Sequence, residues 1–168
     1  MRKVIILDTS ILCVWFGLPG LDICGPDSQK WDRKKVQEKI YGEIKAGSVL
    51  VLPLASIIET GNHISQIDGD RYLQAQKLSD VMVKSAEEAS PWAAFSDQSQ
   101  LWSPEKLKEI AETWPDLATQ RLSLGDATIK DVAEYYARAG WEVELFTGDM
   151  GLKSYEPTSP IVKPRRRK

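Results

Sequence analysis

The sequence predicts an α/β domain with a mostly parallel central sheet between two layers of helices. Three short apolar runs, at residues 4–7, 49–52 and 143–147, have the length and the Val and Ile content of buried strands. Segments with helical periodicity lie between these runs. Because predicted strands alternate with predicted helices, we expect a three-layer α/β/α arrangement.

The predicted helices are amphipathic segments that mostly begin or end at a capping residue, glycine or proline. Between the first two strands, Val36, Ile40 and Ile44 repeat every four residues, and Gly47 follows the last turn. Pro53 is well placed in the first turn of the next helix. In chain order, the predicted helices span residues 11–16, 28–45, 54–67, 70–89, 104–112 and 126–139.

The length of 168 residues favours a single domain rather than two. We expect this domain to span residues 1–155, with a Trp-rich insertion at about 90–122 and a Pro/Arg-rich tail at 156–168. No apolar run approaches the roughly 18 residues of a membrane span. Asp8 interrupts the first apolar run too early for a secretory signal, so a cytoplasmic protein is expected.

Charge is unevenly distributed along the chain. The last six residues carry five of the 22 basic side chains, which leaves the rest of the chain with a net charge of about −7. A protein that binds nucleic acid by bulk electrostatics would be basic throughout, and this one is not. The tail residues could bind phosphates or could be a solubilising end: Arg165, Arg166, Arg167 and Lys168.

Four acidic residues stand where the predicted fold would bring them together. Asp8 and Asp149 follow the first and last predicted strands, Glu59 lies within an apolar helix, and Asp126 is in the first turn of another. Ligands collect at the carboxyl ends of parallel strands. Four carboxylates at this edge would repel one another, and oxygen ligands suit hard divalent cations. The pattern therefore predicts a site for two metal ions.

The segments around these acids resemble the four acidic motifs of the PIN-domain nucleases: Leu7-Asp8-Thr9-Ser10, Ile58-Glu59, Leu124-Gly125-Asp126-Ala127 and Phe146-Thr147-Gly148-Asp149. Their order, spacing and predicted elements all agree with the family, and the resemblance covers about residues 1–155. It implies that Asp8, Glu59, Asp126 and Asp149 bind Mg²⁺ or Mn²⁺ and are catalytic. Ser10 and Thr147 would orient a carboxylate or a water molecule.

The family resemblance implies a metal-dependent phosphodiesterase that hydrolyses RNA. The expected activity is that of an endoribonuclease acting on single strands, with DNA as a possible substrate. A toxin-type protein with an antitoxin partner, and a homodimer, are further expectations from the resemblance. A pair of metal ions would supply the activated water and stabilise the leaving oxygen.

Simpler interpretations of the same residues stay open at this stage. Asp8 and Asp126 could be helix N-caps, and Asp149 could form an ordinary turn. The rival function is a non-catalytic module on a PIN fold that binds nucleic acid or protein. An aspartyl phosphatase using Asp8 is disfavoured, because such enzymes need a second acid two residues later, where this chain has Ser10. His63 is the single histidine, and a packing or capping role is favoured for it.

Overall fold

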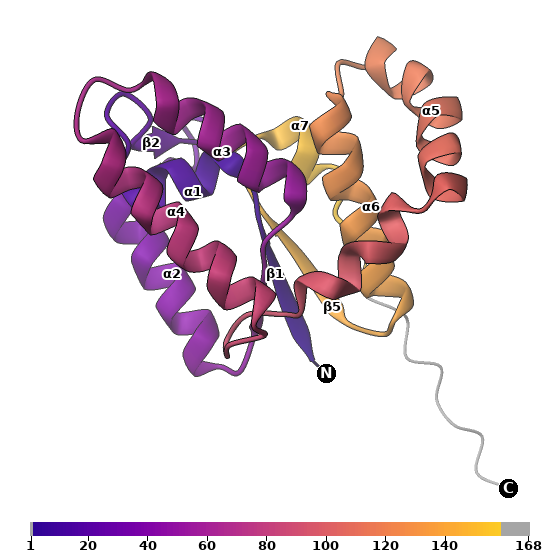
Figure 1. Ribbon diagram of the computed structural model, residues 1–168, viewed down its shortest axis with the longest axis horizontal. Helices are drawn as coiled ribbons and strands as arrows, with labels where there is room; N and C mark the ends of the chain where they lie inside the picture. The colour runs from indigo at the N-terminus through magenta and orange to yellow at the C-terminus, as the bar shows by residue number, and fades with distance from the viewer. Residues whose placement is uncertain (1, 159–168) are drawn as a thin grey trace, which may run out of the picture.

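The computed structural model describes residues 2–158, and its centre is a three-stranded parallel sheet (Figure 1). Strand β1 (Lys3–Leu7) lies between β4 (Val49–Val51) and β5 (Glu142–Phe146). In this register Ile6 is opposite Val51 on one side and Leu145 on the other. The prediction of an α/β fold with a parallel sheet is therefore confirmed.

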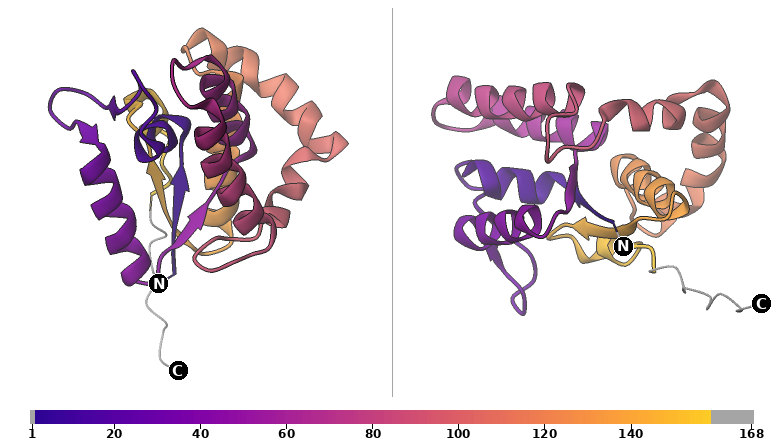
Figure 2. Two further views of the ribbon diagram at one scale, coloured as in Figure 1. Left: turned by 60° about the vertical axis from the view of Figure 1, so that its left-hand side comes forward. Right: turned by 90° about the horizontal axis from the view of Figure 1, so that it is seen from below.

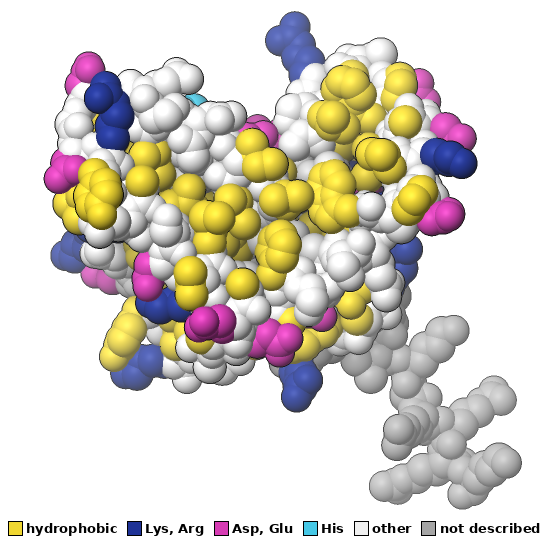
Figure 3. Space-filling view, in the orientation of Figure 1, with side chains coloured by type: hydrophobic (Ala, Val, Ile, Leu, Met, Phe, Trp, Pro, Cys, Tyr) yellow, Lys and Arg dark blue, Asp and Glu magenta, His cyan; other side chains and the backbone are white. Residues whose placement is uncertain are grey.

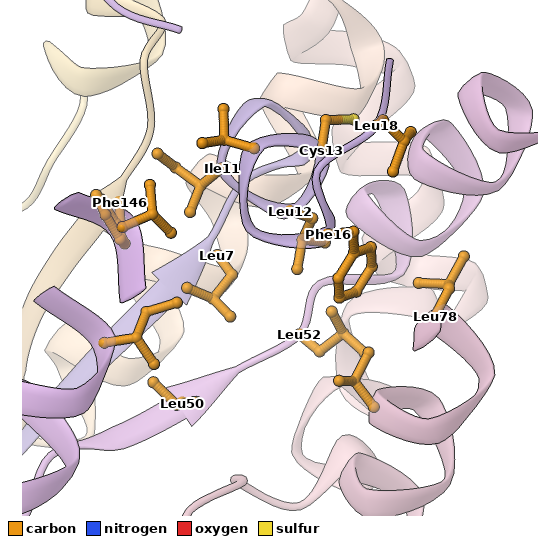
Figure 4. Close-up of a cluster of buried hydrophobic side chains, with 14 of the residues drawn as sticks. Leu7, Ile11, Leu12, Cys13, Phe16, Leu18, Leu50, Leu52, Leu78 and Phe146 are labelled. Atoms are coloured by element: carbon orange, nitrogen blue, oxygen red, sulfur yellow. The ribbon is translucent and has the colours of Figure 1, made fainter. Parts of the chain in front are cut away.

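Side chains alternate along β1 and enter two separate apolar clusters. Ile5 and Leu7 point into the first cluster, while Val4 and Ile6 point into the second. All four are fully buried, as expected for the central strand of a sheet that is covered on both faces. Figure 4 shows the first cluster, in which Leu7, Leu50 and Phe146 from the three strands lie on one side of the apolar side chains of α1.

Helices from the first half of the chain cover the first cluster, and helices from the second half cover the second. Residues of α1 (Thr9–Phe16), α2 (Arg33–Lys45), α3 (Leu54–Gln66) and α4 (Arg71–Ala86) contribute to the first cluster. The second cluster contains residues of α6 (Leu124–Arg138) and α7 (Met150–Lys153). Figure 2 shows α2 and α6 on opposite sides of the strands.

The start of α2 differs from the prediction. Helix was expected from residue 28, but Trp31–Asp32 forms strand β3, which pairs with β2 (Ile23–Cys24) in a short antiparallel hairpin. The Asp32 carboxylate accepts a hydrogen bond from the N–H of Lys35 and caps α2, so the helix begins at Arg33. The Trp31 ring meets Phe146 edge to face at 4.8 Å, which anchors the hairpin to β5.

The Trp-rich segment at 90–122 is largely helical. It contains the 3₁₀ helix η1 (Phe95–Trp102) and α5 (Pro104–Thr119). The expectation that the helix ends at residue 112 was wrong, since α5 continues through Pro115 even though proline lacks the N–H that would bond to the preceding turn. Trp92 is buried beside Leu50, so the segment begins by packing against the edge of the sheet.

The tail residues Arg165, Arg166, Arg167 and Lys168 lie outside the described residues. Within residues 2–158, none of the helices combines the length and apolar character needed to cross a membrane.

Candidate functional site

The four acidic residues of the predicted site line one cavity at the carboxyl ends of β1 and β5. The cavity has a volume of about 310 Å³, and Asp8, Glu59, Asp126 and Asp149 all contribute to its wall. Asp8 follows β1, Glu59 is on α3, Asp126 is in the first turn of α6, and Asp149 precedes α7. In Figure 1 this is the end of the sheet where α1, α3, α6 and α7 converge. The fold thus brings together residues that are up to 141 positions apart.

Asp8 occupies the N-cap position of α1, but its side chain caps nothing. Instead, its Oδ2 accepts hydrogen bonds from the hydroxyls of Thr147, at 2.7 Å, and Ser10, at 2.9 Å. The residue is only 6% exposed, and these two donors provide hydrogen bonds that water would otherwise supply. Asp8 is therefore the N-cap residue by position, while its side chain does not cap the helix. Within residues 2–158 no hydrogen bond is made to the second oxygen of this carboxylate, Oδ1.

Ser10 and Thr147 each connect Asp8 to the segment that carries Asp149. Thr147 Oγ1 accepts a hydrogen bond from the N–H of Asp149 at 2.9 Å. Ser10 Oγ accepts one from the N–H of Gly148 at 3.0 Å. Both hydroxyls donate to Asp8 and accept from the turn after β5, so they fix the relative positions of two of the acids. We expected these two hydroxyls to orient a carboxylate, and the hydrogen bonds to Asp8 are in keeping with that prediction.

Glu59 is half-buried on α3 and faces the first turn of α6. Its Oε2 accepts a hydrogen bond from Thr9 Oγ1 at 3.0 Å, while Oε1 lies against the backbone of Gly125. A Cβ on Gly125 would overlap Oε1. The Leu124-Gly125-Asp126 sequence therefore lets a carboxylate from α3 approach α6 more closely than any other residue at 125 would allow.

Asp126 is not the N-cap of α6. Ser123 holds that position, and its hydroxyl accepts a hydrogen bond from the N–H of Asp126 at 3.0 Å. Burial, followed by the charge of Asp8, raises the pKa of the Asp126 carboxyl to about 6; Asp149 and Glu59 act in the same direction. The charges of the other three acids thus add to the effect of burial at this residue.

Asp149 combines a local role with a place at the cavity. It caps the short helix α7, because its Oδ1 accepts hydrogen bonds from the N–H groups of Gly151, at 2.8 Å, and Leu152, at 3.3 Å. The simple turn interpretation is correct for this oxygen. The residue is exposed, and Oδ2 is its second oxygen. One carboxylate therefore both shapes the backbone and lines the site.

Several other residues line the cavity that we had not assigned to the site: Thr9, Leu21, Ile23, Cys24, Ser123 and, exposed on α3, His63. Ser123 could have been found from its spacing to Asp126, which matches a capping box. Thr9 carries no such signal, since its contact with Glu59 joins residues 50 positions apart. Cys13 also reaches the cavity, but burial raises the pKa of its thiol to about 12, which makes it an inert nucleophile.

The spacing of these side chains is wider than that of a formed metal centre. Within residues 2–158, no three Asp, Glu, His or Cys side chains are close enough together to hold one ion in common. The donor chemistry nevertheless suits hard cations, because the cavity wall contains four carboxylates and no Lys or Arg. The two-ion site therefore stays a prediction.

Comparison of the chain with known protein families, with curated proteins and with solved structures found no match.

Proposed function

We propose that this protein is a metal-dependent nuclease with a PIN-like, three-layer α/β/α fold. The observation that carries the proposal is the shared cavity of Asp8, Glu59, Asp126 and Asp149 at the carboxyl end of a parallel sheet. Carboxylates that repel one another in a partly buried site lose that repulsion when divalent cations bind. The raised pKa of Asp126 is in keeping with such a site.

The proposed cofactor is Mg²⁺ or Mn²⁺, held by the four carboxylates. When bound, such ions activate water as a nucleophile and neutralise charge on a phosphodiester. The chain's own contribution is orientation. Ser10 and Thr147 fix Oδ2 of Asp8, Thr9 fixes Oε2 of Glu59, and the N–H groups of α7 fix Oδ1 of Asp149. Each of these three carboxylates then has one oxygen held by the protein.

Asp126 is the carboxylate whose charged form is least favoured in the metal-free site. Burial, followed by the charges of Asp8, Asp149 and Glu59, raises its pKa to about 6, while the Ser123 hydroxyl acts in the opposite direction. Bound cations would offset the repulsion and favour the charged form. We therefore count Asp126 among the residues that would hold a cation.

The proposed substrate is single-stranded RNA, as the resemblance to toxin-type PIN ribonucleases implies, and DNA is the alternative. The test is cleavage of labelled single-stranded RNA and DNA with Mn²⁺, with Mg²⁺ and with EDTA. Asp126→Asn is expected to abolish cleavage. The matched control is Asp131→Asn on the same helix, because Asp131 faces Lys106 at 3.7 Å and lies outside the cavity.

A non-catalytic binding module is the second candidate, favoured by the wide spacing of the acids. Folded wild-type protein that neither cleaves RNA or DNA nor binds Mn²⁺ by calorimetry would support it and overturn the nuclease. Metal-dependent cleavage that is lost in Asp126→Asn and kept in Asp131→Asn would decide for the nuclease.

A further inference from the structure

A second cavity adjoins the acidic one and has a different character. Its volume is about 210 Å³, and Glu59 is the one acidic residue in its wall. The remaining wall is mostly apolar, from α3, the end of η1 and the first turn of α6: Leu54, Ala55, Ile58, Trp102, Leu124, Gly125 and Thr128. We call this the Trp102 pocket.

The Trp102 pocket and the acidic cavity share Glu59 as a common wall. The same segments also border both, since Leu124 and Gly125 of the pocket directly precede Asp126 of the cavity. A polymer bound at the acidic cavity would therefore reach the pocket with its next unit. Because the two cavities are neighbours, the ligand of the Trp102 pocket is expected to be part of the molecule that binds at the acidic cavity.

Three large apolar side chains of the pocket are strongly exposed: Trp102 by 42%, Leu124 by 46% and Ile58 by 54%. All six tryptophans lie within the described residues, and the other five are buried or partly buried, so Trp102 is the only exposed one. Trp92 is buried, and the Trp114 indole N–H donates to the carbonyl of Leu122. Figure 3 shows hydrophobic side chains gathered on this face between the two halves of the molecule.

We infer that the Trp102 pocket binds a nucleobase of the single-stranded substrate, next to the phosphate that the acidic cavity would process. The inference rests on the proposed function and deepens it. A base is flat and largely uncharged, so it can stack on an indole and on apolar side chains. A phosphate would not enter, because the pocket offers no cation and has Glu59 in its wall.

The proposed pocket also assigns a function to the 90–122 segment, which supplies Trp102. Trp102 comes from the 90–122 segment, while Glu59 and Leu124 belong to the helices that carry the acidic site. Stacking tolerates any base, so the pocket would set the position of the strand rather than read its sequence. Correct placement of the next phosphate is the expected result.

The test compares binding of labelled eight-nucleotide RNAs, intact or with one abasic position moved along the strand. It uses full-length protein with Asp126→Asn, in Mn²⁺, so that the strand is not cut. Trp102→Ala is expected to weaken binding of intact RNA between about 5-fold and 100-fold, whereas Trp102→Phe keeps most of the affinity. Tyr72→Ala removes another exposed aromatic, 74% exposed on α4 and outside both cavities, and is the control.

For one position of the abasic site, we expect the RNA to bind more weakly to protein that keeps Trp102. The same RNA should bind the Trp102→Ala variant as tightly as intact RNA does. Such non-additivity supports the pocket even if wild-type protein proves unable to cleave RNA, which would overturn only the nuclease. Equal RNA affinity of Trp102→Ala and Tyr72→Ala overturns the pocket while leaving cleavage untouched. If Trp102→Ala changes the sedimentation of the protein but not its RNA binding, another protein molecule covers this face and the pocket is overturned. Absence of any RNA binding would also overturn the pocket, while the nuclease is decided by the cleavage test.

Discussion

Thr147 Oγ1 lies 2.7 Å from Asp8 Oδ2, and this hydrogen bond joins the residues that directly follow two neighbouring strands. Parallel pairing of β1 with β5 places Leu7 opposite Phe146, so the next residue of each strand reaches the same edge. The hydroxyl is buried with the carboxylate, and it also accepts the N–H of Asp149. The register of β1 and β5 therefore determines how Asp8 and Thr147 are placed at the acidic cavity.

The first prediction concerns that hydroxyl. Thr147→Val keeps the shape of the side chain but removes a donor to a buried carboxylate, and is expected to cost about 1.5–3 kcal/mol of unfolding free energy. Cleavage should fall as well, because Asp8 loses its orientation. Thr60→Val is the matched control: Thr60 is fully buried, and within residues 2–158 its Oγ1 has no partner, so the same change should be neutral or stabilising. Urea denaturation measures both. Equal losses in the two variants would contradict the assigned role.

A second prediction follows from the contact of Glu59 with Gly125. The Cβ in Gly125→Ala would displace the Glu59 carboxylate, which can rotate away at little cost because it is the end of a flexible side chain. We expect a large loss of cleavage with little change in stability. Gly42→Ala on α2 meets nothing within 4 Å and should raise the unfolding free energy by about 0.5–1 kcal/mol with full activity. Full activity in Gly125→Ala would exclude a role for the Glu59 position.

A third prediction concerns the stability of the metal-free protein. The folded pKa of Asp126 is raised from 3.8 to about 6, so its contribution to stability is fully present below pH 3.8 and lost as pH rises through 6. Asp126→Asn should therefore raise the unfolding free energy at pH 8 by about 1–3 kcal/mol, and by much less at pH 4. Thermal or urea unfolding in EDTA at both values measures the difference. If Asp126→Asn lowers the unfolding free energy at pH 8, the charged Asp126 carboxylate is not destabilised by burial and its acidic neighbours.

A fourth prediction concerns an ion-pair cluster at the opposite end of the sheet. Glu43 accepts hydrogen bonds from Lys3, at 2.8 Å, Lys39, at 2.6 Å, and Ser48, at 2.6 Å. Although burial alone would raise it, these donors hold the pKa of Glu43 at about 2. Stability from this residue is thus present above pH 4.5 and lost as pH falls towards 2.

Glu43→Gln should lower the unfolding free energy at pH 7 by about 2–3 kcal/mol and remove that part of the acid transition. The control is Glu38→Gln, an exposed glutamate on the same helix. Urea unfolding between pH 2 and pH 7 tests both variants. Identical pH profiles for Glu43→Gln and wild-type protein would exclude the cluster as a source of stability.

The strands and most helices could be predicted from the sequence because each carries a local signal. Residues 4–7 are continuously apolar and form the buried central strand, and the repeat of Val36, Ile40 and Ile44 identifies α2. The positions of the four acids, two after strands and two on helices, followed from the same signals. Their convergence on one cavity follows from the parallel sheet, which the alternation of elements predicts.

Other features depend on contacts between distant parts of the chain and could not be predicted. The β2–β3 hairpin has two residues in each strand, too few for a pattern, and it is held by Trp31 against Phe146. The start of α2 differs from the prediction because Trp31 and Asp32 pair with β2, so that the helix begins only after them, at Arg33. Thr9 was missed because its partner Glu59 is on another helix.

The pairing of β1 with β5 also determines when the candidate site can exist during synthesis. Asp8 leaves the ribosome well before its hydroxyl donor at 147 and its neighbours Asp126 and Asp149, which follow more than a hundred residues later. Contacts between such distant positions form only after the intervening residues have been made. The acidic cavity is therefore incomplete on every nascent chain that has not reached residue 149, and any chemistry it performs belongs to the finished fold alone.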